Sequence, residues 1–228
     1  MCAVARAESS AIQRSCGRPS TMRRMLKVLH ADDSLVVIDK PAGLLAVPGR
    51  GESGRDNAAS RLQQIYPDAL TVHRLDMATS GLLLFGRGAD VHRDLNAAFA
   101  ARRVYKRYVA VVHGVIEAEH GEIDAPLAAD WPHRPRQRVD LEHGKPSLTR
   151  WRVLERGMSS TRLELEPVTG RSHQLRVHLL SIGHSICGDP LYGALPPAAP
   201  RMLLHACELR LDHPRTGEAL TFTAAPPF

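Results

Sequence analysis

The chain has 228 residues, of which 43% are hydrophobic, so it is long enough and apolar enough to bury a sizeable core. No stretch approaches the roughly 20 consecutive apolar residues that a membrane helix needs, and no membrane association is expected. The net charge of +6 favours a polyanionic partner, most often nucleic acid.

The first 24 residues, MCAVARAESSAIQRSCGRPSTMRR, are rich in Arg and Ser and contain few large apolar side chains. A transit peptide has a similar composition, but the stretch lacks the apolar core of a secretory signal. We expect a disordered tail over 1–24, or translation that begins at Met22 or Met25. The folded domain is then predicted over 25–228.

The first half of this domain alternates strand and helix signals. Alternating apolar residues, β-branched residues and helical spacing of Ala and Leu indicate the element types. In chain order the prediction is a strand at 35–38, a helix within 55–66, a strand led by Leu82, a helix over 89–103 and a strand over 104–114.

The second half begins with a polar stretch that is interrupted by prolines, 126–147, which we expect to be a loop with a basic cluster. Period-two alternation predicts paired antiparallel strands at 148–156 and 160–168. A helix over 171–182 and strands within 201–211 and 219–226 complete the chain. The pattern predicts one α+β domain with a largely antiparallel, mixed sheet flanked by helices and loops.

The cysteines are scattered at positions 2, 16, 187 and 207, and none forms a Cys-x-x-Cys pair. A disulfide scaffold or a zinc ribbon is therefore not expected, and a reducing cytoplasm fits this usage. The sequence also lacks a His-Glu-x-x-His pattern. We expect no metal site.

One carboxylate stands out in HRLDMATSGLLLFGR, residues 73–87: Asp76 precedes a small polar turn and an apolar run. An Asp in this position is most often a turn former. In a functional role it would need a cation, because desolvation beside an apolar strand would otherwise raise its pKa. An ionised Asp76 could attack an electrophilic carbon or act as a base. The chain offers no second placed carboxylate for glycosidase chemistry.

The predicted helix 171–182 has a polar beginning and an apolar end. It is either an ordinary amphipathic helix with a solvated end or a helix whose first turn faces a ligand such as a phosphate. At 100° per residue, one face carries Arg171, Gln174, Leu175, His178 and Ile182.

Tyr108 lies in the predicted strand RVYKRYVA, where a tyrosine is usually a packing residue. In an RNA-handling protein it could also stack on a base. Aromatic residues make up only 4% of the chain, so a broad stacking platform is not expected. A single base, flipped out of its stack, fits better.

These segments resemble the motifs of the RluA family of pseudouridine synthases, from about residue 26 to the end of the chain. The similarity lies in DKPAGLLAVPG, HRLDMATSGLLL, KRYVAVVHG, DWPHRPRQRV, GKPSLTRW, GRSHQLRVHLLSIGHSICGDPLYG and RMLLHACELRLDHP, in that order.

The resemblance implies roles for particular residues. Asp76 matches the catalytic aspartate, Arg171 the basic residue that pairs with it, and Tyr108 the tyrosine that stacks on the target base. Arg74 matches an arginine that enters the RNA where the flipped nucleotide leaves. We expect further RNA contacts from His73, Arg134, Arg136, Arg138, Gln174 and Arg176, and apolar walls of the base pocket from Leu175 and Leu82.

The resemblance also implies uridine isomerisation without a cofactor, on 23S rRNA, on tRNA anticodon stem-loops or on both. We expect the protein to be a monomer. Asp76 would either attack C1′ or remove a proton from C2′ to give a glycal, and the sequence does not choose between them. Two other functions remain open from the sequence: an RNA-binding or ribosome-assembly module without catalysis, and a different enzyme such as a nucleosidase.

Overall fold

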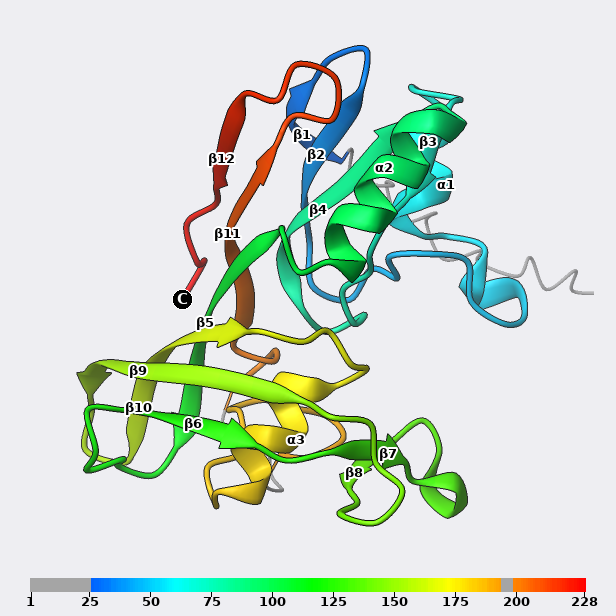
Figure 1. Cartoon of the computed structure of the whole chain (residues 1–228). Coiled ribbons are helices and arrows are strands. Elements are labelled where there is room, and N and C mark those ends of the chain that lie inside the picture. Colours follow the sequence, from blue (N-terminus) through cyan, green and yellow to red (C-terminus); the bar gives the residue numbers. More distant parts are fainter. Residues whose placement is uncertain (1–25, 194–198) are drawn as a thin grey trace, which may run out of the picture.

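Ten of the strands form one mixed sheet, in a computed structural model that describes residues 26–193 and 199–228. The tail predicted over 1–24 lies outside the described residues. The central order is β1-β2-β4-β11-β5-β10-β9-β6, with β3 beside β4 and β12 beside β11 (Figure 1). The β4–β11 pair is parallel and the other pairs within this sheet are antiparallel, which confirms the predicted fold class.

The strands of this sheet are β1 (Lys27–Ala31), β2 (Leu35–Lys40), β3 (Ala69–Thr71), β4 (Ser80–Arg87), β5 (Tyr105–His113), β6 (His120–Asp124), β9 (Leu148–Arg156), β10 (Ser160–Pro167), β11 (Leu204–Asp212) and β12 (Ala219–Thr223). A separate hairpin pairs β7 (Leu127–Ala129) with β8 (Gln137–Val139). The helices are α1 (Ala58–Gln63), α2 (Ala89–Ala100) and α3 (Gln174–Ser181), with 3-10 turns η1 (Glu52–Gly54) and η2 (Trp131–His133).

The predicted strands and helices are present, with two corrections. The stretch 126–147 is not only a loop, because it holds the β7–β8 hairpin. The helix predicted from residue 171 begins at Gln174, because His173 before it adopts the left-handed conformation with φ 55°. This conformation cannot continue a right-handed helix, so Arg171 belongs to the preceding loop.

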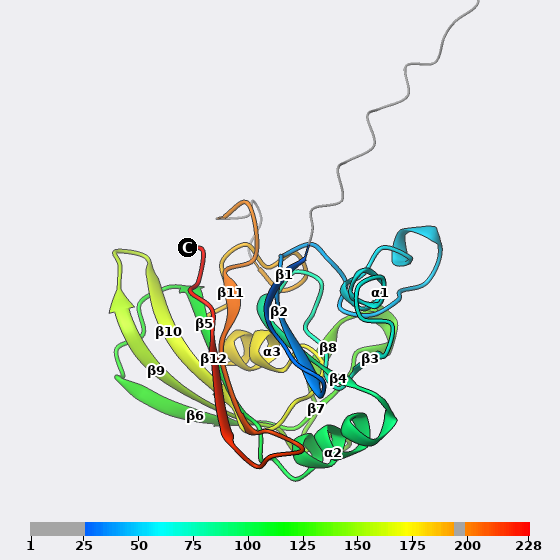
Figure 2. The same cartoon turned by 90° about the horizontal axis from the view of Figure 1, so that it is seen from above.

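Two large apolar clusters lie side by side along the sheet. One gathers residues of β1, β2, β4, α1 and α2, and the other gathers residues of β5, β10 and α3. The sheet curves around α3 (Figure 2). Tyr108 on β5 packs against both clusters, which places it at the boundary between the two halves of the fold.

The parallel pairing of β4 with β11 depends on a glycine. Gly81 lies opposite Ala206, and a Cβ atom on Gly81 would come within 2.2 Å of the Ala206 carbonyl oxygen. Its φ of 110° is also one that other residues rarely adopt. The loop that carries Asp76 leads into β4, which begins at Ser80, one residue before Gly81. The close contact of Gly81 with Ala206 therefore fixes the position at which this loop joins the centre of the sheet.

Candidate active site

The loop that carries Asp76 is held by backbone and lysine contacts. The Thr79 amide donates to the Asp76 carbonyl at 3.1 Å, and the Met77 carbonyl accepts from the Gly43 amide at 2.8 Å. Lys40 Nζ also donates to the Met77 carbonyl, at 3.3 Å, and to the Leu44 carbonyl, at 2.7 Å. The Lys40 side chain is buried, and burial lowers its pKa to about 7. The DKPAG segment is therefore a support for the loop.

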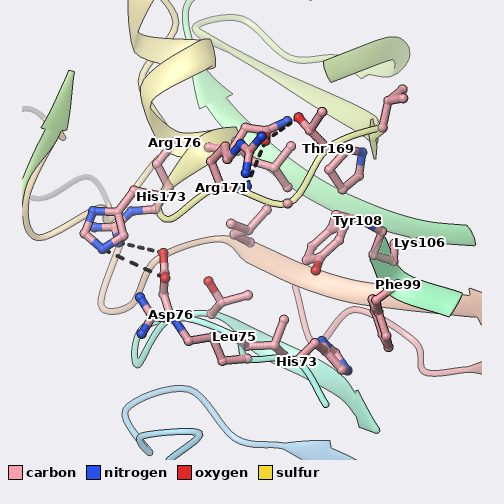
Figure 3. Close-up of a pocket in the computed structure, with 18 of the residues that line it drawn as sticks. His73, Leu75, Asp76, Phe99, Lys106, Tyr108, Thr169, Arg171, His173 and Arg176 are labelled. Carbon is pink, nitrogen blue, oxygen red and sulfur yellow. Dashed lines mark hydrogen bonds and ion pairs between the residues drawn. The ribbon is translucent and has the colours of Figure 1, made fainter. Parts of the chain in front are cut away.

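The cation beside Asp76 is Arg176. Its Nη1 donates to Asp76 Oδ2 at 2.9 Å (Figure 3). The Nε of Arg171 instead donates to the Pro146 carbonyl at 3.4 Å. The predicted pairing of Asp76 with Arg171 is therefore wrong. The physical reason is the late start of α3: Arg176 lies in its first turn, whereas Arg171 lies in the loop and is exposed.

Arg176 is itself held by a second carboxylate. Its Nε and Nη2 donate to the two oxygens of Asp189, at 2.7 and 2.8 Å. The side chains of Arg176 and Asp189 are only 3% and 0% exposed. Burial opposes the charged form of Asp189, but the hydrogen bonds and charge of Arg176 outweigh it, so the pKa of Asp189 lies below its ordinary value. One guanidinium thus serves two carboxylates.

Asp76 lies in the wall of a cleft of about 580 Å³, within the usual size range of small-ligand sites. Tyr108 and Leu175 line the cleft together with Leu75 and Leu204. Burial, reinforced by the negative charge of Asp76, raises the pKa of Tyr108, so its phenol stays neutral. The cleft combines a carboxylate with an aromatic ring and aliphatic walls.

Leu82 does not line the cleft, contrary to the prediction. It is 1% exposed and belongs to the apolar cluster around β2 and β4. All residues of β4 except the last are buried, so the strand is covered on both faces and its apolar run did not reveal which side chains face the cleft.

Three other residues predicted to contact RNA are held by hydrogen bonds or ion pairs within the protein. His73 accepts a hydrogen bond from the Leu84 amide, and burial lowers its pKa to about 3, so it is not a cation for phosphate. Gln174 is 3% exposed, and its amide group bonds to Thr169 and to the Leu148 carbonyl. Arg176 is equally buried in its ion pairs. All three side chains form part of the wall of the cleft.

The other predicted RNA-binding arginines lie near the opening or on the β7–β8 hairpin. Arg74 is exposed, lines the cleft and donates to Ser172 Oγ at 3.1 Å. Arg134 stacks on Trp131, with 4.2 Å between the guanidinium carbon and the ring centre. Arg138 pairs with Asp140. Residues 130–138, which also include Arg136, are called the arginine loop below.

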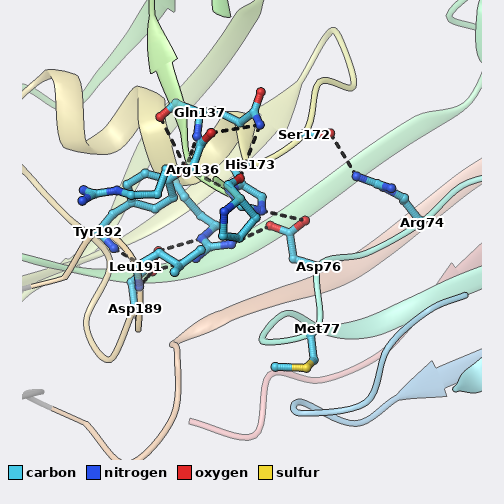
Figure 4. A network of polar contacts seen from close by, with 12 residues as sticks. Arg74, Asp76, Met77, Arg136, Gln137, Ser172, His173, Asp189, Leu191 and Tyr192 are labelled. Atoms are coloured by element: carbon cyan, nitrogen blue, oxygen red, sulfur yellow. Dashed lines mark hydrogen bonds and ion pairs between the residues drawn. The ribbon is translucent and has the colours of Figure 1, made fainter. Parts of the chain in front are cut away.

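Several residues of the site were not singled out from the sequence. Tyr192 packs its ring on Arg176 and Arg136, and its hydroxyl bonds to His173 and to the Gln137 amide (Figure 4). Asp189 and Tyr192 both lie in the short motif GDPLYG, residues 188–193, and this motif is the sequence signal that could have pointed to the network.

No group of three or more His, Cys, Asp or Glu side chains in 26–193 and 199–228 is placed to hold a metal ion. Within the same residues, no helix is long and apolar enough to cross a membrane. The described cysteines, Cys187 and Cys207, are buried and free.

The site is a cleft that holds one arginine-bound carboxylate beside a neutral tyrosine ring, and comparison with known proteins gives the class of the protein. The chain belongs to the RNA pseudouridylate synthase family, whose model matches residues 34–181. It is an RNA pseudouridine synthase of the RluA type. It is 47% identical to the dual-specificity RNA pseudouridine synthase RluA of Escherichia coli K12 over 89% of this chain and 94% of that protein.

Further relatives and solved structures are also pseudouridine synthases or carry a pseudouridylate synthase domain. The Haemophilus influenzae dual-specificity RNA pseudouridine synthase RluA is 45% identical, over 89% of this chain and 94% of that protein. Among solved structures, human RNA pseudouridylate synthase domain containing 1 matches with a TM-score of 0.77 and 27% identity, covering 93% of this chain and 87% of its own. Human RNA pseudouridylate synthase domain containing 4 gives a TM-score of 0.70 at 25% identity, covering 88% of each chain.

Proposed function

We propose that this enzyme isomerises specific uridines in 23S rRNA, in tRNA anticodon stem-loops or in both, as a cytoplasmic monomer with Asp76 as its catalytic residue. The names of the relatives, dual-specificity RNA pseudouridine synthases, support RNA as the substrate, and the choice of 23S rRNA and tRNA rests on the resemblance of the motifs. The free Cys187 and Cys207 fit a reducing compartment.

The placement of Asp76 carries the proposal. Its Oδ2 is held by Arg176 at 2.9 Å, while the ion contact of Oδ1 is the longer one to His173 Nε2, at 3.9 Å. The side chain is 18% exposed, at the wall of the cleft that Tyr108 lines. Asp76 therefore has one oxygen fixed by a cation and one oxygen available to a substrate in the cleft.

Two courses of the reaction fit this carboxylate. It can attack C1′ of the uridine, so that a C1′–O bond forms and the N1–C1′ bond breaks, with the electron pair leaving on uracil. Alternatively it can remove the C2′ proton, and uracil leaves as a glycal forms. In the first course the base turns, C5 bonds to C1′ and the C1′–O bond to Asp76 breaks, which frees the carboxylate. In the second course C5 of the turned base bonds to C1′ and the proton returns to C2′. In both courses the proton on C5 is then released and N1 takes up a proton. The cleft walls would hold the detached base and limit the access of water.

A uridine inside a helix or loop can reach Asp76 only when it leaves its stack. Tyr108 offers a neutral ring against which the base can stack, and Leu175 gives an apolar wall. Arg74 is exposed at the same cleft, where it can fill the space that the flipped nucleotide vacates.

The arginine loop is the proposed contact with the RNA backbone. Neutralising Arg134, Arg136 and Arg138 together should reduce the slope of log Kd against log salt, because each lost phosphate contact removes about 0.7–0.9 of a released counterion. The measurement is filter binding of a tRNA transcript between 50 and 300 mM salt. An unchanged slope would place the RNA elsewhere.

The function is tested by tritium release from RNA that carries [5-³H]uridine. Wild type and Asp76→Asn are compared on separate tRNA and 23S rRNA transcripts. Release by wild type and its loss in Asp76→Asn, with RNA affinity little changed, is the expected result, since phosphate contacts dominate binding. Substantial release by Asp76→Asn would remove Asp76 from catalysis. Binding without release from either RNA would favour a binding module, and free uracil would indicate a nucleosidase.

A further inference from the structure

The turn over residues 189–192 lies behind the catalytic pair. Asp189 Oδ2 accepts from Arg176 Nε, and its Oδ1 accepts from Arg176 Nη2 and from the amides of Leu191, at 2.8 Å, and Tyr192, at 3.1 Å. These contacts occupy both oxygens of a side chain that is 0% exposed. The backbone amides of its own turn therefore fix the Asp189 carboxylate, and the fixed carboxylate in turn orients Arg176.

This arrangement determines how much of Arg176 can reach Asp76. A guanidinium can present two parallel N–H groups to a carboxylate, which is its preferred geometry. Here the fork of Nε and Nη2 is given to Asp189, and only Nη1 remains for Asp76. Without Asp189, Arg176 could turn and bind both oxygens of Asp76, which would neutralise the group that must react.

We propose that Asp189 is a positioning residue for catalysis: it holds the fork of Arg176, limits Asp76 to one hydrogen bond from that guanidinium, and so keeps the second oxygen of Asp76 available to the uridine. The inference rests on the proposed role of Asp76. Asp189 itself touches no substrate, because its side chain is buried behind Arg176.

Tyr192 connects the same turn to the arginine loop. Its hydroxyl accepts from the Gln137 amide at 2.6 Å and bonds to His173 Nδ1 at 2.8 Å (Figure 4). Its ring packs on Arg136 and on Arg176. The turn that orients Arg176 is therefore anchored to the proposed RNA-binding loop and to the start of α3, which makes it a rigid support.

The test is the pH dependence of kcat for tritium release in wild type, Asp189→Asn and Asp189→Glu. Asn removes the charge and one acceptor, whereas Glu keeps the charge but displaces the fork by one methylene. We expect both variants to lower the plateau of kcat about 10- to 100-fold, as is typical when a partner that orients an active group is lost. KM should change little, because Asp189 does not contact RNA.

The acidic limb of the profile of kcat against pH distinguishes the loss of the Asp189 charge from the displacement of its carboxylate. The groups around Asp76 are Arg176 and His173 from the α3 side, Lys40 behind the loop and Tyr108 across the cleft. Losing the negative charge of Asp189 favours ionised Asp76, so the limb should move to lower pH in Asp189→Asn. In Asp189→Glu the limb should stay in place while the plateau is low.

A matched control is Asp32→Asn, in the turn between β1 and β2. Asp32 also accepts two backbone amides, those of Ser34 at 2.7 Å and Leu35 at 2.8 Å, but it lines neither the cleft nor the network of Asp76. It should lower stability without changing the plateau or the limb. Thermal unfolding of each variant gives the folded fraction to which kcat is normalised.

The outcomes are distinct. A normal plateau in Asp189→Glu, or a shifted limb with a normal plateau in Asp189→Asn, would overturn the positioning role. If wild type released no tritium, the proposed function would fail, and a crystal structure of Asp189→Asn would still decide the inference. An Arg176 that still gave a single hydrogen bond to Asp76 in that variant would then refute it.

Discussion

Replacing Arg176 by Met should remove the one cation that two carboxylates share. Asp189 would be left buried, and Asp76 largely so, with side-chain exposures of 0% and 18%. Breaking a buried pair by removing one partner costs about 3–5 kcal/mol. That loss is a large part of the roughly 5–15 kcal/mol by which a domain is stable. At about 2–4 °C per kcal/mol, Tm should fall by about 6–20 °C.

The matched variant is Arg171→Met, which removes an equally long cation from the same segment. Arg171 is exposed and makes one long hydrogen bond, of 3.4 Å, to the Pro146 carbonyl. Its loss should cost about 0.5 kcal/mol or less. Urea unfolding followed by circular dichroism at pH 7 gives both free energies of unfolding. Equal losses in the two variants would refute the assignment of Arg176 as the partner of Asp76.

The difference in free energy of unfolding between wild type and Arg176→Met should also change with pH in a definite direction. The pKa of Asp189 is lowered in the folded protein, so its stabilising contribution is present above its ordinary value of 3.8 and is lost as pH falls through the lower folded value. In Arg176→Met the buried Asp189 has no cation, and its pKa should rise, so it takes up a proton earlier. The stability gap between wild type and variant should narrow between pH 6 and 3. A gap that widens on acidification would contradict the electrostatic argument.

Two further substitutions test the supports of the site. Gly81→Ala should destabilise the protein by several kcal/mol in thermal unfolding, because the new Cβ would lie 2.2 Å from the Ala206 carbonyl oxygen; a loss of less than about 1 kcal/mol would show that β4 and β11 can separate at this point. Lys40→Met should be more destabilising at pH 9 than at pH 6. The pKa of Lys40 is about 7 in the folded protein and 10.5 ordinarily, so between these values the unfolded chain binds more protons than the folded protein. The free energy of unfolding that wild type owes to Lys40 therefore rises with pH over this range. Urea unfolding at both pH values measures this, and the reverse order would exclude a lowered pKa.

Local patterns were enough for most of the elements. The period-two alternation of 148–156 and 160–168 identified β9 and β10, and helical spacing identified α2 within 89–103. These assignments succeeded because side-chain alternation follows from backbone geometry alone. The order of the motifs also identified the family, and Asp76, Tyr108 and Leu175 do line one cleft.

Only the tertiary structure decided which cation serves Asp76. Arg171 and Arg176 both lie in GRSHQLR, and the sequence does not show that the left-handed conformation of His173 delays the helix. The partner that fixes Arg176, Asp189, is 13 residues further along the chain and reaches it only through the fold. His73, Gln174 and Arg176, which were expected to contact RNA, are held by contacts within the protein and line the cleft. Spacing along a chain determines local geometry, whereas ion pairs and burial depend on which segments the folded sheet brings together.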